Sequence, residues 1–306
     1  MHRYGPHDNF AVIDNWRFWI IHLWVEGFFE LFATVLVAVM FFLMGLVTAK
    51  SATRVVYLDA ILYLGAGIIG TGHHWYFTGQ GTLNMALASC FSAMEVVPLT
   101  LLTLDAWQFM RLQERNPGAA AGHAARQKWA ILFLIAVGFW NFVGAGVFGF
   151  LINLPVVSYW EIGTQFTANH GHAAMMGVYG MLAIGFFVFV AAYFIPRDQG
   201  VERAMRWSFW SLNGGLAWMV CANLFPIGAL QLHDALVHGY WHARSPEFFA
   251  RDEVRALEWI RLPGDIVFIV GGIAPLVYIA LRMVVNRNRP GVIPPHEPIA
   301  PLTQAR

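Results

Sequence analysis

The chain has 306 residues, of which 58% are hydrophobic and only 12% are charged. Soluble domains carry about 25% charged residues, so this composition excludes an ordinary soluble protein and indicates one embedded in a lipid bilayer. The formal net charge of +1 gives no sign of a nucleic-acid partner.

Apolar runs along the chain predict an all-α fold, a polytopic membrane helix bundle. A helix needs about 20 apolar residues to cross the hydrocarbon core of a bilayer. About seven runs meet this length, at residues 17–47, 55–77, 83–106, 128–153, 160–195, 206–230 and 263–285.

The remaining segments are expected to flank or cap the bundle. Residues 1–16 form a short polar segment before the bundle at 17–285. The connection at 231–262 is long enough to form a cap outside the membrane. The proline-rich segment 286–306 is expected to be a disordered cytoplasmic tail.

Basic residues are distributed unequally between the two sides of this bundle. The first, third and fifth connections, together with the tail, hold 13 of the 19 Lys and Arg residues. The positive-inside rule therefore puts the C-terminus in the cytoplasm and the N-terminus outside. A chain that starts outside usually follows earlier helices, so we expect a C-terminal portion of a longer protein. A natural seven-span protein with a translocated N-terminus is the alternative.

Titratable side chains lie inside the predicted spans, where they are costly and usually functional. Five histidines and three glutamates are involved: His22, Glu26, Glu30, His73, His74, Glu95, His170 and His172. Taken singly, each has a simpler explanation, because a lone histidine is often a hydrogen-bonded packing residue and a lone glutamate can be protonated. Their combination favours a redox metalloprotein.

The spacings of these residues suggest how they are arranged. His22 and Glu26 are four residues apart and share a helix face, which Glu30 continues. Adjacent helical residues diverge by about 100°, so His73 and His74 would meet only at a metal between their two directions. Imidazoles combined with a carboxylate suit iron, among other transition metals.

His170 and His172 lie two positions apart, which on a helix separates their directions by about 200°. One helix could therefore carry two ligands, one on each flank. The glycines around them, Gly171, Gly177 and Gly180, leave room for flat macrocycles, so the pair suits two haems.

Five stretches together resemble the catalytic subunit of bacterial nitric oxide reductases, in the haem–copper oxidase superfamily. They are HLWVEG (22–27), GTGHHWYFTG (70–79), FSAMEVVPL (91–99), WNFVGAGVFGFLINLP (140–155) and NHGHAAMMGVYGMLAIG (169–185). The stretch FPIGALQLHDALVHGYWHARSPEF (225–248) is more similar to the quinol-dependent branch. The resemblance implies seven helices that correspond to the sixth through the twelfth of a twelve-helix bundle.

The resemblance also implies a ligand set for a metal. By this comparison His22, His73 and His74 are the imidazole ligands of a non-haem iron, and Glu26 is its carboxylate ligand. An oxygen-reducing haem–copper oxidase usually has a tyrosine four residues after the first of these histidines, or on a nearby helix; at the first of these positions this chain has Glu26.

The same resemblance implies two haem ligands and two acids. His170 resembles the proximal ligand of a high-spin haem b, and His172 resembles a ligand of a low-spin haem b. Glu30 and Glu95 match two further acidic residues near the diiron site and would carry protons.

The implied reaction is the reduction of two nitric oxide molecules to nitrous oxide and water, with two electrons and two protons. Quinol is the expected electron donor, and the expected location is the bacterial cytoplasmic membrane. Expected partners are the missing N-terminal half or a partner chain, and a second copy in a homodimer. An oxygen-reducing oxidase, a nitric oxide dismutase and a non-catalytic or truncated subunit are the alternatives.

Two polar clusters lie near the predicted cap. His233, Asp234, His238 and His242 are in the first, where residues 238 and 242 have metal-binding spacing if they are helical. A structural or solvated role is favoured for this cluster because it lies outside the bilayer. Arg261 and Asp265 form the second, which is a candidate contact for haem propionates.

Overall fold

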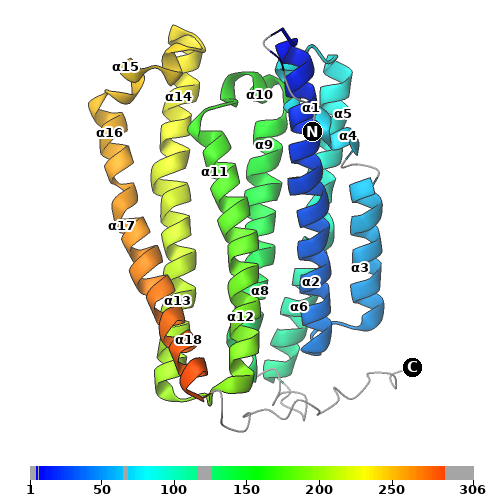
Figure 1. Ribbon diagram of the computed structural model, residues 1–306, viewed down its shortest axis with the longest axis vertical. Helices are drawn as coiled ribbons and strands as arrows, with labels where there is room; N and C mark the ends of the chain where they lie inside the picture. Colours follow the sequence, from blue (N-terminus) through cyan, green and yellow to red (C-terminus); the bar gives the residue numbers. More distant parts are fainter. Residues whose placement is uncertain (1–4, 6, 65–67, 116–125, 287–306) are drawn as a thin grey trace.

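The computed structural model describes residues 5, 7–64, 68–115 and 126–286. Within these residues every regular element is helical, and the long helices run up and down one bundle (Figure 1). Six helices are long and apolar enough to cross a membrane: Phe10–Leu43, Thr82–Leu112, Lys128–Asn153, Gln165–Phe194, Gln199–His238 and Asp252–Asn286. The protein is therefore a multi-pass membrane protein with a helical bundle fold, as predicted.

Most of these spans contain a wider, π-helical turn between two α-helical segments. The first four spans consist of α1 (Phe10–His22), η1 (Leu23–Phe28) and α2 (Phe29–Leu43); α5 (Thr82–Glu95) and α6 (Val97–Arg115); α8 (Lys128–Trp140), η5 (Asn141–Phe148) and α9 (Gly149–Asn153); and α11 (Gln165–Ala174), η6 (Met175–Gly180) and α12 (Met181–Phe194). The last two consist of α13 (Gln199–Trp218), η7 (Met219–Leu224) and α14 (Phe225–His238); and α16 (Asp252–Trp259), α17 (Arg261–Ile266), η9 (Val267–Ile273) and α18 (Ala274–Asn286).

The predicted run at 55–77 is built differently from the other six. It contains α3 (Ala49–Leu62), followed after residues 65–67, which lie outside the described part, by three short helical segments. These are α4 (Ile68–Gly70), η3 (Thr71–His74) and η4 (Tyr76–Thr78). Gly72 allows η3 to press against α5, because a Cβ at this position would lie 2.9 Å from Cβ of Ala88. The run therefore delivers a short, tightly packed segment to the bundle interior.

The centre of the bundle is formed by α8, α12 and α13. Phe133 and Leu134 of α8 and Leu212 and Leu216 of α13 are completely buried. The span Lys128–Asn153 has 56% of its apolar window buried, against 17% for Asp252–Asn286. The first of these is thus central, whereas the second lies at the edge of the bundle, packed along α13 (Figure 1).

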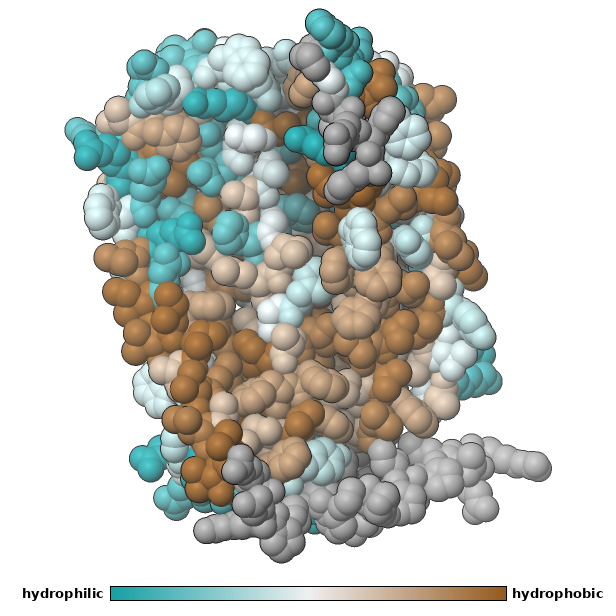
Figure 2. Space-filling view, in the orientation of Figure 1, coloured by the Kyte–Doolittle hydropathy of each residue, from teal (hydrophilic) through white to brown (hydrophobic). Residues whose placement is uncertain are grey.

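The surface of the bundle is apolar around its middle and polar at its ends (Figure 2). The connection from α2 to α3 and the connection from α12 to α13 lie at one end, where the basic connections are found (Figure 1). The other end holds α10 (Pro155–Glu161), α15 (Pro246–Phe249) and the start of α1. The predicted cap contains the end of α14, η8 (His242–Arg244), α15 and α16.

The N-terminal segment expected from the sequence can be compared with the structure. Helix α1 begins at Phe10, inside the segment 1–16 that was expected to be a polar segment before the bundle, and Asn9 caps it by accepting a hydrogen bond from the Ala11 N–H. The expected tail lies outside the described residues from position 287 onward.

Candidate metal centre and adjoining cavity

Four of the predicted residues meet at one point inside the bundle. His22 ends α1, Glu26 lies in η1, and His73 and His74 end η3. Glu26 Oε2 is 2.8 Å from His22 Nε2, and Glu26 Oε1 is 3.7 Å from His73 Nε2 and 3.4 Å from His74 Nε2. One membrane span and the short segment η3 therefore supply three imidazoles and one carboxylate to the same volume.

The adjacent histidines converge rather than diverge. Their Nε2 atoms are 2.9 Å apart, and their ring centroids are 4.0 Å apart. This is possible because η3 ends at His74, so the two side chains are not held on a continuing helix. Two nitrogens bound at about 2.1 Å and at right angles to one metal ion would lie about 3 Å apart.

The donor atoms fit a metal ion better than they fit one another. His22 Nε2 is buried and makes no well-directed hydrogen bond, although a carboxylate oxygen lies 2.8 Å away. Buried polar atoms normally have partners. The four side chains offer ligand atoms within 4.8 Å of one another, so a transition metal held by three imidazoles and a carboxylate would satisfy the site.

The surrounding residues hold this cluster in position. Thr71 Oγ1 lies 3.1 Å from His22 Nδ1, which leaves Nε2 directed at Glu26. Ser92 Oγ donates to Glu26 Oε2 over 3.1 Å, and the ring of Phe18 stacks on His74 with centroids 5.0 Å apart. Partners of this kind fix the orientation of metal ligands and tune the metal.

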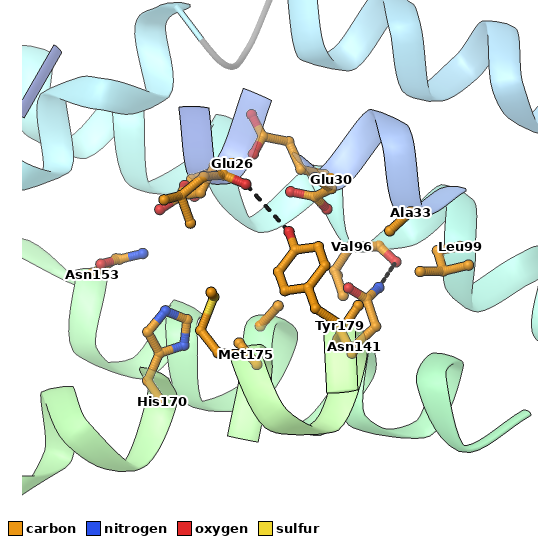
Figure 3. A pocket seen from close by; sticks show the side chains of 16 residues that line it. Glu26, Glu30, Ala33, Val96, Leu99, Asn141, Asn153, His170, Met175 and Tyr179 are labelled. Carbon is orange, nitrogen blue, oxygen red and sulfur yellow. Dashed lines mark hydrogen bonds between the residues drawn. The ribbon is translucent and has the colours of Figure 1, made fainter. Parts of the chain in front are cut away.

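A cavity adjoins the cluster on the side of Glu26 (Figure 3). Its walls come from four of the membrane spans and mix acidic, amide and apolar side chains: Val25, Glu26, Glu30, Ala33, Ser92, Glu95, Val96, Leu99, Asn141, Ala145, Asn153, His170, Ala174, Met175, Val178 and Tyr179. His170 on α11 faces Glu26 from across this cavity (Figure 3). The cavity therefore separates the four-residue cluster from the first predicted haem ligand.

His170 is held by the neighbouring π-helical segment. Its Nδ1–H donates to the Gly144 carbonyl over 2.8 Å, which leaves Nε2 as the nitrogen available for a ligand. Gly149 provides space for the ring, since a Cβ there would lie 3.0 Å from His170 Cε1. Both features fit a histidine positioned to bind a haem iron at the cavity.

His172 has a similar hydrogen bond but a different place. Its Nδ1–H donates to the Ala168 carbonyl of its own helix over 2.8 Å, and it does not line the cavity. The structure thus separates the two histidines onto different flanks of α11, as their spacing suggested.

Glu30 and Glu95 both line the cavity beside Glu26. Glu95 is buried, and its Oε1 has no hydrogen-bond partner. Glu95 and His22 both approach the backbone at Gly70, where a Cβ would be in ordinary contact with them, 3.6 Å from Glu95 Oε1 and 3.4 Å from His22 Cε1.

Two residues near this site were missed in the sequence. Asp59 on α3 is 2% exposed, one of its oxygens has no partner, and its carboxyl interacts electrostatically with those of Glu30 and Glu95. A charge inside the predicted run 55–77 was the available signal. Tyr179 lines the cavity and donates to the Val25 carbonyl over 3.3 Å. It has no comparable signal, because tyrosines are common in membrane helices.

The second polar cluster predicted from the sequence is self-contained. Arg261 Nε donates to Asp265 Oδ2 over 2.9 Å, four residues along the same span, and both side chains are about two-fifths exposed. Neither residue lines the cavity.

Comparison with known proteins places this architecture in a family. Residues 4–267 match the family model described as cytochrome C and quinol oxidase polypeptide I. A nitric oxide reductase subunit of Stutzerimonas stutzeri is 30% identical over 272 residues, which cover 84% of this chain and 53% of that protein. The chain thus spans about half the length of the curated relative it matches. Because the family model matches well over half of its residues, the chain belongs to the cytochrome c and quinol oxidase polypeptide I family, the haem–copper oxidases.

Proposed function

We propose that this chain carries the catalytic centre of a membrane nitric oxide reductase. The reaction is 2 NO + 2 e⁻ + 2 H⁺ → N₂O + H₂O. The observation that carries the proposal is the Glu26 carboxylate, which lies 2.8–3.7 Å from three imidazole nitrogens. Similarity to the nitric oxide reductase protein of Stutzerimonas stutzeri supports it.

In this proposal His22, His73, His74 and Glu26 hold a non-haem iron. A carboxylate is a hard ligand and a poor partner for cuprous copper, whereas imidazole and carboxylate together suit ferrous iron. The carboxylate also adds a negative charge that three neutral imidazoles lack. This charge stabilises a higher oxidation state of the bound metal.

His170 would hold a high-spin haem b on the far wall of the cavity, and His172 a low-spin haem b on the other flank of α11. When bound, the two irons at the cavity would supply electrons and binding positions for two nitric oxide molecules. The cavity walls contribute by confining these two small molecules, which turns bond formation between them into a problem of proximity. Apolar side chains such as Val96, Leu99 and Val178 suit a small, weakly polar substrate.

Glu30 and Glu95 would deliver the two protons. Both reach the cavity, and Glu95 Oε1 is buried without a partner, so it can take a proton and pass it on. Asp59 is a third acid that interacts with Glu30 and Glu95. It does not line the cavity and lies next to Thr34 of α2. A carboxyl with a free buried oxygen in this position is suited to receiving protons for Glu30 and Glu95.

The wider setting of the proposal follows from the sequence. We place the protein in the bacterial cytoplasmic membrane with its N-terminus outside, and we propose quinol as the electron donor because residues 225–248 resemble the quinol-dependent branch. We propose two kinds of partner. The first is a set of upstream helices, either in an N-terminal half of the same protein or on a separate chain. The second is another copy of this chain, in a homodimer.

Oxygen reduction is the second candidate function, since Tyr179 lines the cavity and oxygen reductases use a tyrosine at this kind of site. The alternatives differ in metal content. Iron, copper and haem per chain, measured on purified, detergent-solubilised protein, should show iron in excess of haem and no copper. One copper per chain would instead favour an oxidase, and a chain with neither metal nor haem would not be catalytic by itself.

A further inference from the structure

The cap contains a second group of metal-ligating side chains, far along the chain from the centre described above. Asp234 lies near the end of α14, His238 is its last residue, and His242 begins η8. His238 Nδ1 is 3.0 Å from Asp234 Oδ1, and His242 Nδ1 is 2.6 Å from Asp234 Oδ2. The ligand atoms of the three side chains lie within 4.8 Å of one another.

This arrangement does not arise from the helical spacing that the sequence suggested. Helix α14 ends at His238, because Gly239 adopts φ +99°, a conformation that favours glycine. The chain then turns back, and the Ala243 carbonyl accepts a hydrogen bond from Gln231 Nε2 over 2.9 Å. That bond fixes the returning segment against α14, so His242 is held beside His238 before any ligand arrives.

The exposure of the three side chains suits an ion that enters from water. The Asp234 side chain is 1% exposed, whereas those of His238 and His242 are 56% and 40% exposed. A buried carboxylate therefore forms the floor of the group, and two accessible imidazoles form its rim. An ordinary solvated surface pair would have an exposed carboxylate.

One cation already contacts the carboxylate. Arg251 Nη1 lies 3.1 Å from Asp234 Oδ1, and its Nη2 lies 2.6 Å from Glu253 Oε1. If a metal ion displaces the Arg251 guanidinium from Asp234, Glu253 can still hold the guanidinium. Because Nδ1 of each imidazole faces Asp234, the ring proton can sit on Nε2 while Nδ1 binds a metal.

We propose that Asp234, His238 and His242 form a zinc site in the cap. Two imidazole nitrogens and one carboxylate oxygen are a common protein ligand set for Zn²⁺, with a water molecule as the fourth ligand. Zinc there would tie the end of α14 to the returning segment. The site is independent of the proposed nitric oxide chemistry, because it shares no residue with the cavity.

The test is the number of zinc ions bound per chain at a fixed, low-micromolar free zinc concentration, measured by equilibrium dialysis and elemental analysis on the full chain. The double variant His238→Ala/His242→Ala should bind one zinc ion fewer than the unmodified chain. His233→Ala is the matched control, since His233 is exposed, precedes Asp234 on the same helix and is outside the group. Any zinc bound at the central histidines is common to all of these proteins and cancels in the comparison.

Arg251→Gln gives a second readout that keeps all three ligands. Removing the competing positive charge should tighten zinc binding about tenfold, given the Coulomb energy of like charges at this separation near a surface. Equal zinc content in the double variant and the unmodified chain would overturn the proposal. So would an Arg251→Gln variant with unchanged or weaker zinc binding, because a purely hydrogen-bonded cluster predicts no gain.

Discussion

Glu26 is the residue on which the choice of metal depends. It is the only acid within 4.0 Å of the three clustered imidazoles in the described part of the chain, and Ser92 keeps one of its oxygens in place. Its neighbours His22 and His73 are buried, so they cannot exchange a lost ligand for bulk water. A change at this one carboxylate should therefore alter the metal without unfolding the bundle.

The substitution Glu26→Gln tests this expectation, because glutamine keeps the shape and can still accept from Ser92 but lacks the charge. We expect iron to bind about tenfold more weakly or worse, since losing even a partner that only orients a metal ligand costs about 10- to 100-fold in affinity. Iron retained per chain during titration with a chelator measures the effect. Glu30→Gln is the control, as Glu30 lines the cavity but is outside the four-residue cluster. Equal iron retention by both variants would contradict the assignment.

Asp59 allows a second prediction at the scale of one residue. A buried carboxyl beside Glu30 and Glu95 that supplies protons should limit turnover when it is neutralised, although it touches no metal ligand of the cluster. We expect Asp59→Asn to lower turnover of the assembled enzyme about 100-fold, within the range for loss of a proton-transferring group, with iron content unchanged. Asp105→Asn is the matched control and should leave turnover unchanged. Asp105 also contacts α3, where it accepts a hydrogen bond from Ser51, but it is exposed. A turnover unaffected by Asp59→Asn would remove Asp59 from the proton route.

The elements of the fold were largely predictable, and the interruptions inside them were not. Runs of about 20 apolar residues locate membrane helices because the bilayer thickness sets their length, and six of the seven runs are long helices. The run at 55–77 was expected to be a span like the others, yet after α3 it continues as short segments that end at the paired histidines. Hydropathy averages over a window and does not register such breaks.

The same limit applies to side-chain directions within a helix. A regular helix would place Tyr179, nine residues after His170, on the opposite face, but the wider turns of η6 lie between the two residues and change their angular relation. Likewise, the cap histidines meet through a chain reversal at Gly239 rather than along a helix. Residue spacing therefore paired His22 with Glu26, whose side chains do lie together although Glu26 is in the π-helical turn η1, but it missed the partners that meet across other irregular turns.

The connection between α10 and α11 should make stability depend on pH. Glu161 is 2% exposed, and burial raises its pKa to about 7, although a hydrogen bond from Thr167 and the nearby Arg244 both act to lower it. Between its ordinary pKa near 4.5 and the raised value, the folded protein binds the proton more tightly than the unfolded chain does. The free energy of unfolding should thus decrease as the pH rises through this window, by up to about 3 kcal/mol.

The variant Glu161→Gln should lose this dependence, because the amide does not ionise. Unfolding midpoints in mixed micelles at pH 5 and pH 8 give the measurement, and the difference between the two pH values should shrink in the variant. Glu258→Gln, at an exposed position of α16, should behave like the unmodified protein. Parallel pH profiles for all three proteins would show that Glu161 does not carry the effect.

At the scale of the whole molecule, the distribution of charge and the arrangement of helix ends predict the same orientation. The connections rich in Lys and Arg lie at one end of the bundle, and the cap and the start of α1 lie at the other (Figure 1). The positive-inside rule assigns the basic end to the cytoplasm. The cap, with its proposed zinc site, would then face outward and meet whatever metal ions the external medium contains.

Cysteine labelling can test this orientation directly. In a background with Cys90→Ala and Cys221→Ala, Lys50→Cys marks the basic end at the start of α3, and Asp252→Cys marks the cap at the start of α16; both positions are exposed. A membrane-impermeant thiol reagent applied to intact spheroplasts should label the Asp252→Cys variant and leave the Lys50→Cys variant unlabelled, and inverted vesicles should give the opposite result. Permeabilised cells control for reactivity, since both thiols should then react. Labelling of the Lys50→Cys variant alone in spheroplasts would reverse the assigned orientation, and with it the side from which the cap could acquire zinc.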